Sequence, residues 1–302
     1  MMAVIVTCVA AGALLAALLL FRSKWERTHI QTDVYEISTE KLGVDWDGYT
    51  IVVLADLHDN QFGKDNCELL AAIEAAHPDV ILIAGDMITE HHGKKPLKLE
   101  PLGHFLWKLT KHYPVYYGDG NHEQRQENRE KFDAWLAQTG VIHLQNASAY
   151  LKGKPGMGNL RVTGMHLPKQ YYLKKGRKLP MRSGELEQIL GPADREAFQI
   201  LLAHCPLYAE EYAAWGADLS VSGHFHGGTI RFPKVGGLMT PQFQFFYPYT
   251  RGIYKMPGGS AYAAVSAGLG THSIDIRLNN VSQLLVVHLR VPQGSDKDRQ
   301  NG

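Results

Sequence analysis

Short aliphatic runs that alternate with helix-like stretches constrain the fold of this chain more than any other feature. Five runs cover residues 49–54, 80–84, 115–117, 200–203 and 219–221. Helix-like segments at 65–76, 101–113, 123–138 and 207–215 separate most of them. Strands that alternate with helices predict an α/β fold with a largely parallel sheet covered on both faces. We also expect an edge strand at 34–38, and further strands at 261–265 and 283–289 that form a second sheet.

Each of the five main runs ends in side chains that bind metals. They are Asp56 and His58 after the first run, Asp86 after the second, Asn121 and His122 after the third, His204 after the fourth, and His224 and His226 after the fifth. Ligands bind outside the carboxyl ends of parallel strands, so these residues can converge although they lie far apart in the chain. A single buried polar residue is more often structural, but the whole series predicts a site.

The chemistry of this series indicates a pair of metal ions. Carboxylate and amide oxygens combined with imidazoles suit Mn²⁺, Fe or Zn²⁺, and the set is too rich in nitrogen for a dedicated Mg²⁺ or Ca²⁺ site. The candidate ligands are too many for one ion but suffice for two if Asp86 bridges them. Two ions about 3.5–4 Å apart can hold a phosphoryl oxygen and activate water. Several glycines nearby permit sharp turns and close backbone approach, namely Gly85, Gly120, Gly223, Gly227 and Gly228.

The pattern resembles the calcineurin-like metallophosphoesterases, in particular their membrane-anchored bacterial YkuE-type branch. The resemblance covers residues 47–289 and rests on Asp56-x-His58, Gly85-Asp86, Gly120-Asn121-His122-Glu123, His204 and Gly223-His224-x-His226-Gly227-Gly228. It implies a four-layer αββα sandwich with a dinuclear centre. The implied ligands are Asp56, His58 and His226 on one ion, Asn121, His204 and His224 on the other, and Asp86 between them.

The same resemblance implies catalytic roles for Asp86 and for His122, which is expected to protonate the leaving oxygen or to stabilise developing charge. Glu123 stands where Asp is common in the family, and we expect it to orient the His122 ring. Cys205 also departs from the family pattern, as do Val281 and Ser282. For Cys205 we favour a small buried residue over a metal ligand.

The apolar segment at residues 3–21 is long enough for a helix of roughly 28 Å, which can span a bilayer. A cleaved signal peptide is the alternative, but the segment lacks basic residues before it and a small-residue cleavage site. A buried core helix is disfavoured because no face is polar. Arg22, Lys24 and Arg27 follow the segment, and the positive-inside rule then places the domain in the cytoplasm. We expect a membrane anchor and polar linker over residues 1–32, a metallophosphoesterase domain over 33–291 and a polar tail over 292–302.

The substrate is less constrained by the sequence. Residues 152–182 are rich in Lys and Arg and include Tyr171 and Tyr172, which fits either a solvated loop or a lid that contacts anionic lipid or a phosphorylated substrate. Residues 242–249 could add an aromatic wall, although core packing is the commoner explanation. With the anchor, these features favour a lipid-linked phosphate or diphosphate ester. Neither segment identifies a compound.

Competing functions remain open. A nuclease or a cyclic-nucleotide phosphodiesterase could use the same site, and a metal-loaded scaffold could bind a partner without turnover. The formal charge of +1 argues against a dedicated nucleic-acid binder. Three scattered cysteines exclude a disulfide framework. A zinc peptidase is disfavoured because the chain has no His-Glu-x-x-His motif.

Overall fold

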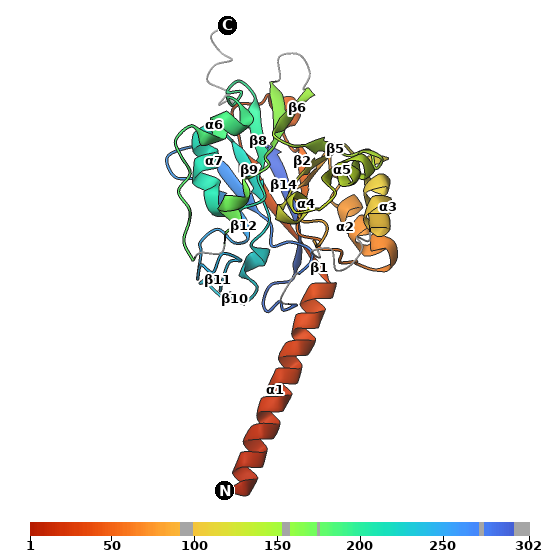
Figure 1. Ribbon diagram of the computed structural model, residues 1–302, viewed down its shortest axis with the longest axis vertical. Helices are drawn as coiled ribbons and strands as arrows, with labels where there is room; N and C mark the ends of the chain where they lie inside the picture. The colour runs from red at the N-terminus through yellow and green to blue at the C-terminus, as the bar shows by residue number, and fades with distance from the viewer. Residues whose placement is uncertain (91–98, 153–157, 174–175, 272–274, 293–302) are drawn as a thin grey trace.

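Two six-stranded sheets pack face to face, with helices on both outer faces (Figure 1). The computed structural model describes residues 1–90, 99–152, 158–173, 176–271 and 275–292. The first sheet contains, in spatial order, β1 (Ile30–Ser38), β14 (Ser282–Arg290), β2 (Thr50–Leu54), β3 (Val80–Ile83), β4 (Val115–Gly118) and β5 (Ile142–Leu144). The second contains β12 (Gly252–Lys255), β13 (Tyr262–Val265), β9 (Leu219–Ser222), β8 (Phe198–Leu202), β7 (Asn159–Gly164) and β6 (Ala147–Lys152). A hairpin is formed by β10 (Arg231–Phe232) and β11 (Gly236–Gly237).

The layers follow from the alternation of apolar side chains along each strand. In β2, Ile51 and Val53 join the core between the sheets, whereas Val52 and Leu54 join the cluster under the helices. The helices over the first sheet are α2 (Cys67–Ala75), α3 (Leu99–Thr110) and α5 (Arg129–Ala137); those over the second are α6 (Glu185–Leu190) and α7 (Ala209–Trp215). The expected αββα sandwich is therefore confirmed.

The sequence interpretation needs two corrections within the domain. The predicted helix at 123–138 is broken into α4 (Asn121–Gln124) and α5, because Asn128 caps α5 by accepting the N–H of Lys131. The strand predicted at 283–289 does not belong to a second sheet. It is β14, which lies between β1 and β2 in the first sheet, and the second sheet instead begins at β6.

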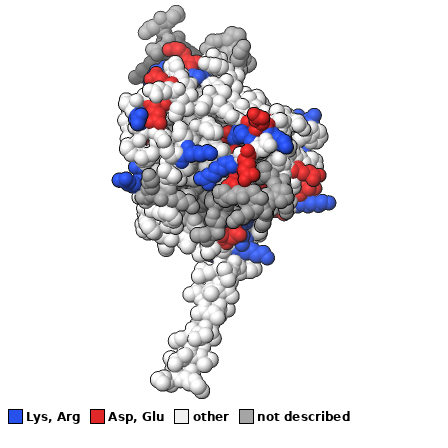
Figure 2. All heavy atoms as spheres, viewed as in Figure 1, with Lys and Arg blue, Asp and Glu red and all other residues white. Residues whose placement is uncertain are grey.

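The N-terminal helix α1 (Met2–Thr28) has an 18-residue window with a mean hydropathy of 2.7, none of it buried, and it is long enough to cross a membrane. Figure 2 shows its outer part as an uncharged rod. The prediction of a polar linker between the apolar segment and the domain, at residues 22–32, is wrong. The helix continues to Thr28 and β1 begins at Ile30, because Ser23 and Glu26 are buried against residues 277–280 of the domain.

Strand direction fixes where the site lies. Strand β1 is parallel to β14, which is antiparallel to β2, and β3 and β4 run parallel to β2. The carboxyl ends of β2, β3 and β4 therefore lie at the same end of the sheet as the start of β1, where α1 joins it.

Beyond residue 292, the expected polar tail lies outside the described residues.

Candidate metal centre

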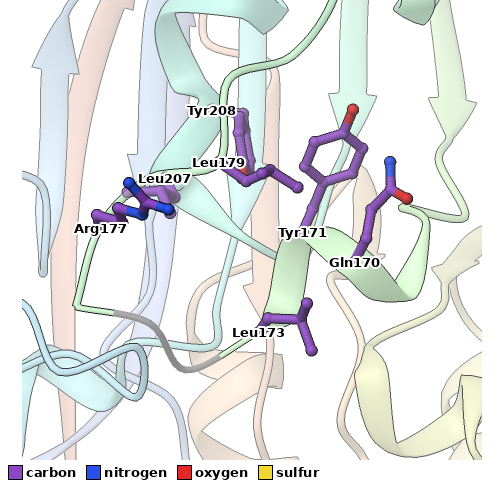
Figure 3. A pocket seen from close by; sticks show the side chains of 7 residues that line it. All are labelled: Gln170, Tyr171, Leu173, Arg177, Leu179, Leu207 and Tyr208. Atoms are coloured by element: carbon purple, nitrogen blue, oxygen red, sulfur yellow. The ribbon is translucent and has the colours of Figure 1, made fainter.

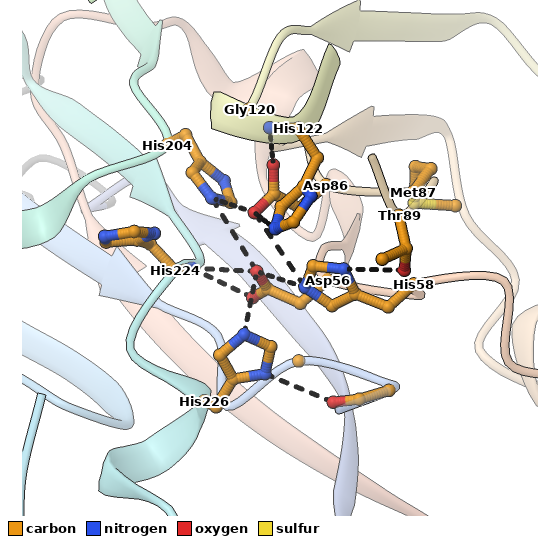
Figure 4. Close-up of polar contacts among 12 residues, drawn as sticks. Asp56, His58, Asp86, Met87, Thr89, Gly120, His122, His204, His224 and His226 are labelled. Atoms are coloured by element: carbon orange, nitrogen blue, oxygen red, sulfur yellow. Dashed lines mark hydrogen bonds and ion pairs between the residues drawn. The ribbon is translucent and has the colours of Figure 1, made fainter. Parts of the chain in front are cut away.

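Seven of the eight residues predicted from the strand ends come together in a buried cluster between the two sheets (Figure 4), and the eighth, Asn121, is buried next to His122 in the chain. Three groups of side chains each place their ligand atoms within 4.8 Å of one another. The groups are Asp56, His58 and His226; His58, Asp86 and His122; and Asp86, His204 and His224. Strands β2, β3 and β4 of the first sheet and β8 and β9 of the second thus contribute to one site. The ends that converge belong to two sheets, and not to the single parallel sheet first expected.

The backbone at this cluster is unusual. Five of the clustered residues have φ between 46° and 67°, in the left-handed region that residues other than glycine rarely adopt. They are Asp56, His58, Asp86, His224 and His226. Such conformations concentrate at functional sites, where the surrounding structure compensates their cost. Gly120 is required for a related reason, since a Cβ there would overlap Oδ1 of Asp86.

Hydrogen bonds to the backbone orient the imidazoles. Nδ1 of His204 lies 2.6 Å from the carbonyl oxygen of Ala84, and Nδ1 of His226 lies 3.2 Å from that of Gly270. Each Nδ1 therefore carries a proton, and Nε2 of each ring turns toward the carboxylates, at 3.0 Å from Asp86 Oδ2 for His204 and 3.7 Å from Asp56 Oδ1 for His226. This is the arrangement of histidines that bind a metal through Nε2.

The charges in the cluster are strongly coupled. Burial raises the pKa of Asp56 to about 7, and the neighbouring Asp86 carboxylate adds to this rise. Burial alone would also raise the pKa of Asp86, but the imidazoles of His204, His122 and His58 hold it well below its usual value. Burial would lower the pKa of His204, yet the two carboxylates raise it to about 9. Two buried carboxylates in one site thus depend on nearby positive charge.

The donor set fits divalent cations. Among the described residues, Asn121 Oδ1 is buried without a hydrogen-bond partner, and the buried Asp86 Oδ2 and His204 Nε2 have only each other, at 3.0 Å. Unsatisfied polar atoms of this kind are rare in folded proteins and call for an explanation. Carboxylate and amide oxygens next to imidazole nitrogens are ligands of Mn²⁺, Fe and Zn²⁺. Bound cations would satisfy all three atoms.

The His122 ring is oriented differently from the expectation. Its Nδ1 accepts the backbone N–H of Glu90 at 3.0 Å, so the neutral ring carries its proton on Nε2, 3.9 Å from Asp86 Oδ2. Glu123, which we expected to orient this ring, does not do so. Its buried carboxylate accepts the N–H groups of Asp86, Met87 and Gly120 and the hydroxyl of Tyr117.

Asp119, at the end of β4, connects neighbouring segments through ion pairs. Its buried carboxylate pairs with Arg129 at 2.7 Å and with His143 at 2.8 Å, and His166 lies 3.5 Å away. Burial would raise its pKa, but these partners hold it below the usual value. Cys205 is buried in the apolar cluster under α6 and α7, as expected, and burial raises its pKa to about 12.

Two residues at the site have no signal in the sequence. The buried side-chain amide of Gln242 lies 2.8 Å from Nε2 of His224 and so helps to fix the orientation of this ring. The Tyr172 ring packs edge-on against the His224 ring, with centroids 5.2 Å apart. Both come from the segments considered as an aromatic wall and a lid, and they reach the site as buried residues. Neither spacing nor residue type distinguished them from their neighbours.

The fold and this cluster define a metal-dependent phosphoester hydrolase. The model of the calcineurin-like phosphoesterase family matches residues 49–228, and the chain belongs to this family. Members of this family use a dinuclear metal centre.

Curated relatives support the assignment over most of the chain. The protein from Bacillus subtilis named uncharacterized metallophosphoesterase YkuE is 25% identical to this chain, and the alignment covers 93% of this chain and 93% of the relative. An uncharacterized metallophosphoesterase of Aquifex aeolicus is 26% identical, covering 91% of this chain and 98% of its own. A zebrafish (Danio rerio) transmembrane protein with a metallophosphoesterase domain is 25% identical, covering 84% of this chain and 56% of its own.

Proposed function

We propose that this protein is a membrane-attached phosphoesterase with two divalent ions, Mn²⁺, Fe or Zn²⁺, in the cluster. One ion is held by Asp56, His58 and His226, the other by Asn121, His204 and His224, with Asp86 between them. The domain of residues 33–291 carries the site, and α1 is its single-pass anchor. The observation that carries the proposal is the convergence of two buried carboxylates and several oriented imidazoles at the carboxyl ends of five strands.

The ions would supply charge neutralisation at the phosphoryl oxygens and lower the pKa of water. The chain's own residues position the two carboxylates and the hydrogen-bond donor of His122. The backbone N–H of His122 donates to Asp86 Oδ1 at 2.8 Å, and that of His224 donates to both oxygens of Asp56 at 3.0 Å, which fixes both carboxylates. His122 would present an Nε2–H to the leaving oxygen of the ester, where it donates a hydrogen bond that stabilises developing charge.

We propose a lipid-linked phosphate or diphosphate ester as substrate, with the domain on the cytoplasmic side. The exposed basic residues Lys169 and Arg177 support an anionic ligand. Other basic residues of this segment act within the protein, since Lys178 pairs with Glu211 at 2.6 Å and Arg161 contacts Ser148 at 2.9 Å. Lys154, Lys174 and Lys175 lie outside the described residues.

Tyr171 and Tyr172 are core residues and not exposed parts of a lid. Tyr171 packs against Tyr208, and the two rings line a small pocket with Leu179 and Leu207 (Figure 3). Arg177 lies at the rim of this pocket. The support for a lipid substrate therefore comes from α1 more than from this segment.

The test uses the full chain in detergent micelles. Its metals are counted by elemental analysis, and hydrolysis of bis-p-nitrophenyl phosphate is measured before and after chelation and after Mn²⁺ is returned. We expect two metals per chain and chelator-sensitive turnover, and we expect Asp86→Asn and His226→Gln to abolish kcat. Asp65→Asn and His112→Gln are matched controls, because both side chains are exposed and neither belongs to the cluster.

Normal kcat in the Asp86 or His226 variant would contradict the site assignment. A folded, metal-loaded protein without turnover would favour the alternative of a scaffold that binds a partner without catalysis. A substrate panel of nucleotides and lipid diphosphates separates the remaining alternatives, because activity on nucleotides alone would favour a nuclease or a cyclic-nucleotide phosphodiesterase.

A further inference from the structure

We infer that an exposed apolar surface beside α1 docks onto the lipid bilayer, so that the metal centre faces the membrane. The surface, called here the aromatic rim, consists of Phe232, Val235, Phe245 and Phe246, which are 45%, 59%, 64% and 48% exposed. This inference rests on the membrane attachment proposed above. It adds a second contact between the protein and the bilayer.

The aromatic rim is a continuous feature built from two segments. Phe232 and Val235 belong to the β10–β11 hairpin, and the Phe232 ring lies 6.3 Å from that of Phe246. The backbone N–H of Phe246 donates to the carbonyl of Leu238 at 3.0 Å, which ties the two segments together. Adjacent exposed apolar side chains of this size mark interaction or membrane surfaces, whereas isolated ones are normal.

The aromatic rim lies close to the point where α1 enters the domain. Asn279 bridges the two, because its backbone N–H donates to the Glu26 carboxylate of α1 at 3.0 Å and its side-chain amide donates to the Arg231 carbonyl of the hairpin at 3.1 Å. Figure 1 shows β10 and β11 at the same end of the domain as the inner end of α1.

Helix geometry places this junction within the bilayer interface. The uncharged part of α1 ends at Phe21, and Glu26 is five residues further on, or about 7.5 Å along the axis. The headgroup layer of one leaflet is about 5–8 Å thick. A hairpin linked to Glu26 through one residue is therefore level with the headgroups, and its apolar side chains can reach the lipid.

The same junction positions a groove of basic character. It has a volume of about 530 Å³ and is lined by residues that include Arg231, Lys234, Tyr254 and Asn279. Basic residues at this level attract anionic headgroups. Because lipid matches both the apolar rim and the basic groove, the bilayer is the occupant that fits this face.

Loops that carry the metal centre contact both α1 and the hairpin. Asn60, two residues beyond His58, donates to the Arg27 carbonyl of α1 at 3.4 Å and to the Leu269 carbonyl at 3.2 Å. The hairpin directly follows His226 along the chain, and Gly228 packs against Gly237 of β11. A phosphoester that projects from the leaflet holding α1 would meet the cluster without leaving the membrane.

The test places a fluorescent label at the aromatic rim of the full chain. Cys8 and Cys67 are replaced by Ser, while Cys205 is fully buried and stays unlabelled. Phe245→Cys is labelled with an environment-sensitive dye in vesicles of phosphatidylcholine and phosphatidylglycerol. Lipids with a doxyl group near the headgroup end of the chain then quench any label in the bilayer. We expect strong quenching and a blue shift of the dye emission.

The control is Ile142→Cys in the same background. Ile142 is 42% exposed and begins β5, which is parallel to β4, so it lies at the end of the sheet opposite α1. Its label should not be quenched. Equal behaviour of the two labels would overturn the inference. So would a label at 245 that is shielded from aqueous iodide but not quenched by doxyl lipid, because a second protein copy would then cover the rim.

Two further readouts separate this inference from the proposed function. A label on the natural Cys8, in a chain with Cys67 replaced, must be quenched, because an unquenched Cys8 would overturn membrane attachment and the inference with it. Hydrolysis of bis-p-nitrophenyl phosphate, a soluble substrate, should be unchanged in Phe245→Cys. If no chain hydrolyses it while label 245 is quenched, the proposed activity fails and the docking surface stands.

Discussion

At the scale of single residues, His122 shows how one backbone contact sets the chemistry of a ring. The N–H of Glu90 occupies Nδ1, which leaves the proton of the neutral ring on Nε2, on the side of Asp86. A carboxylate was expected to orient this ring, and a backbone amide does so instead. The orientation of this ring therefore depends on the backbone of residue 90 and not on the carboxylate of Glu123.

We therefore expect His122→Ala to lower kcat by about 10²–10³, the usual effect of losing one donor to developing charge. Metal content should not change, because His122 is not among the proposed ligands. The measurement is kcat on bis-p-nitrophenyl phosphate together with elemental analysis, and His112→Ala is the exposed control. Loss of metal from the His122 variant would instead make it a ligand, and an unchanged kcat would remove it from the reaction.

Glu123 acts on the cluster through the backbone. Its carboxylate accepts three N–H groups and the Tyr117 hydroxyl, all in a buried setting. In Glu123→Gln one oxygen becomes a donor that faces other donors, so we expect a loss of about 2–4 kcal/mol in the free energy of unfolding. Tyr117→Phe removes one of these bonds and should cost about 1 kcal/mol.

Thermal unfolding of the full chain in micelles measures both variants of this network. Because the network positions the backbone of Asp86, Glu123→Gln should also retain less metal after dialysis. If Glu123→Gln proves as stable as Tyr117→Phe, Glu123 does not organise the loop that carries Asp86.

At the scale of elements, Asp119 joins the end of β4 to α5 and β5 through Arg129 and His143. Removing one partner from a buried ion pair costs about 3–5 kcal/mol, and we expect Asp119→Asn to cost about 3 kcal/mol because Arg129 is partly exposed. Asp133→Asn is the control. Its pair with Arg129 is more exposed and should contribute below about 1 kcal/mol.

The pH dependence of this difference has a definite sign. The folded pKa of Asp119 is held below its unfolded value of about 3.9, so its stabilisation is fully present above that value and declines as pH falls toward the folded pKa. The free energy of unfolding is measured at pH 7 and at pH 3 for the wild type and for Asp119→Asn. The difference between the two proteins should be smaller at pH 3. A constant gap between the two proteins would contradict the ion-pair explanation.

The elements also show what the sequence could predict. Local apolar runs located β2, β3, β4, β8 and β9 to within a few residues, because each is short, buried and bounded by polar residues. The break before α5 was predictable from Asn128, a good N-cap, and was overlooked. The place of β14 was not predictable from its own residues, since its pairing with β1 and β2 joins segments over 200 residues apart.

The site residues also include some that the sequence could predict and others that it could not. The cluster was predictable because its members recur at strand ends, whereas Gln242 and the amide of Glu90 reach the site from irregular segments. Their residue types carry no signal, because amides and backbone N–H groups occur everywhere on loops. Ser23 and Glu26 appeared to belong to a polar linker for a related reason, as their partners lie some 250 residues away.

At the scale of the whole molecule, a chain of contacts joins α1 to the metal centre. Glu26 accepts the N–H groups of Asn279 and Asn280, and Ser23 accepts that of Arg277. The buried Arg277 guanidinium donates to the carbonyl of Gly270, which also receives Nδ1–H of His226. Helix α1 therefore braces the loop that orients a proposed metal ligand.

We expect Glu26→Ala to weaken this brace. One buried and one partly buried N–H group lose their acceptor, which should cost about 3 kcal/mol in the free energy of unfolding and reduce the metal retained after dialysis, since the loop that holds His226 loosens. Thermal unfolding and elemental analysis of the full chain in micelles measure both effects. Arg22→Gln is the control, because the Arg22 side chain is 58% exposed and its pair with Glu26 should contribute below about 1 kcal/mol. Equal stability and metal content in the two variants would show that α1 tethers the domain without supporting its site.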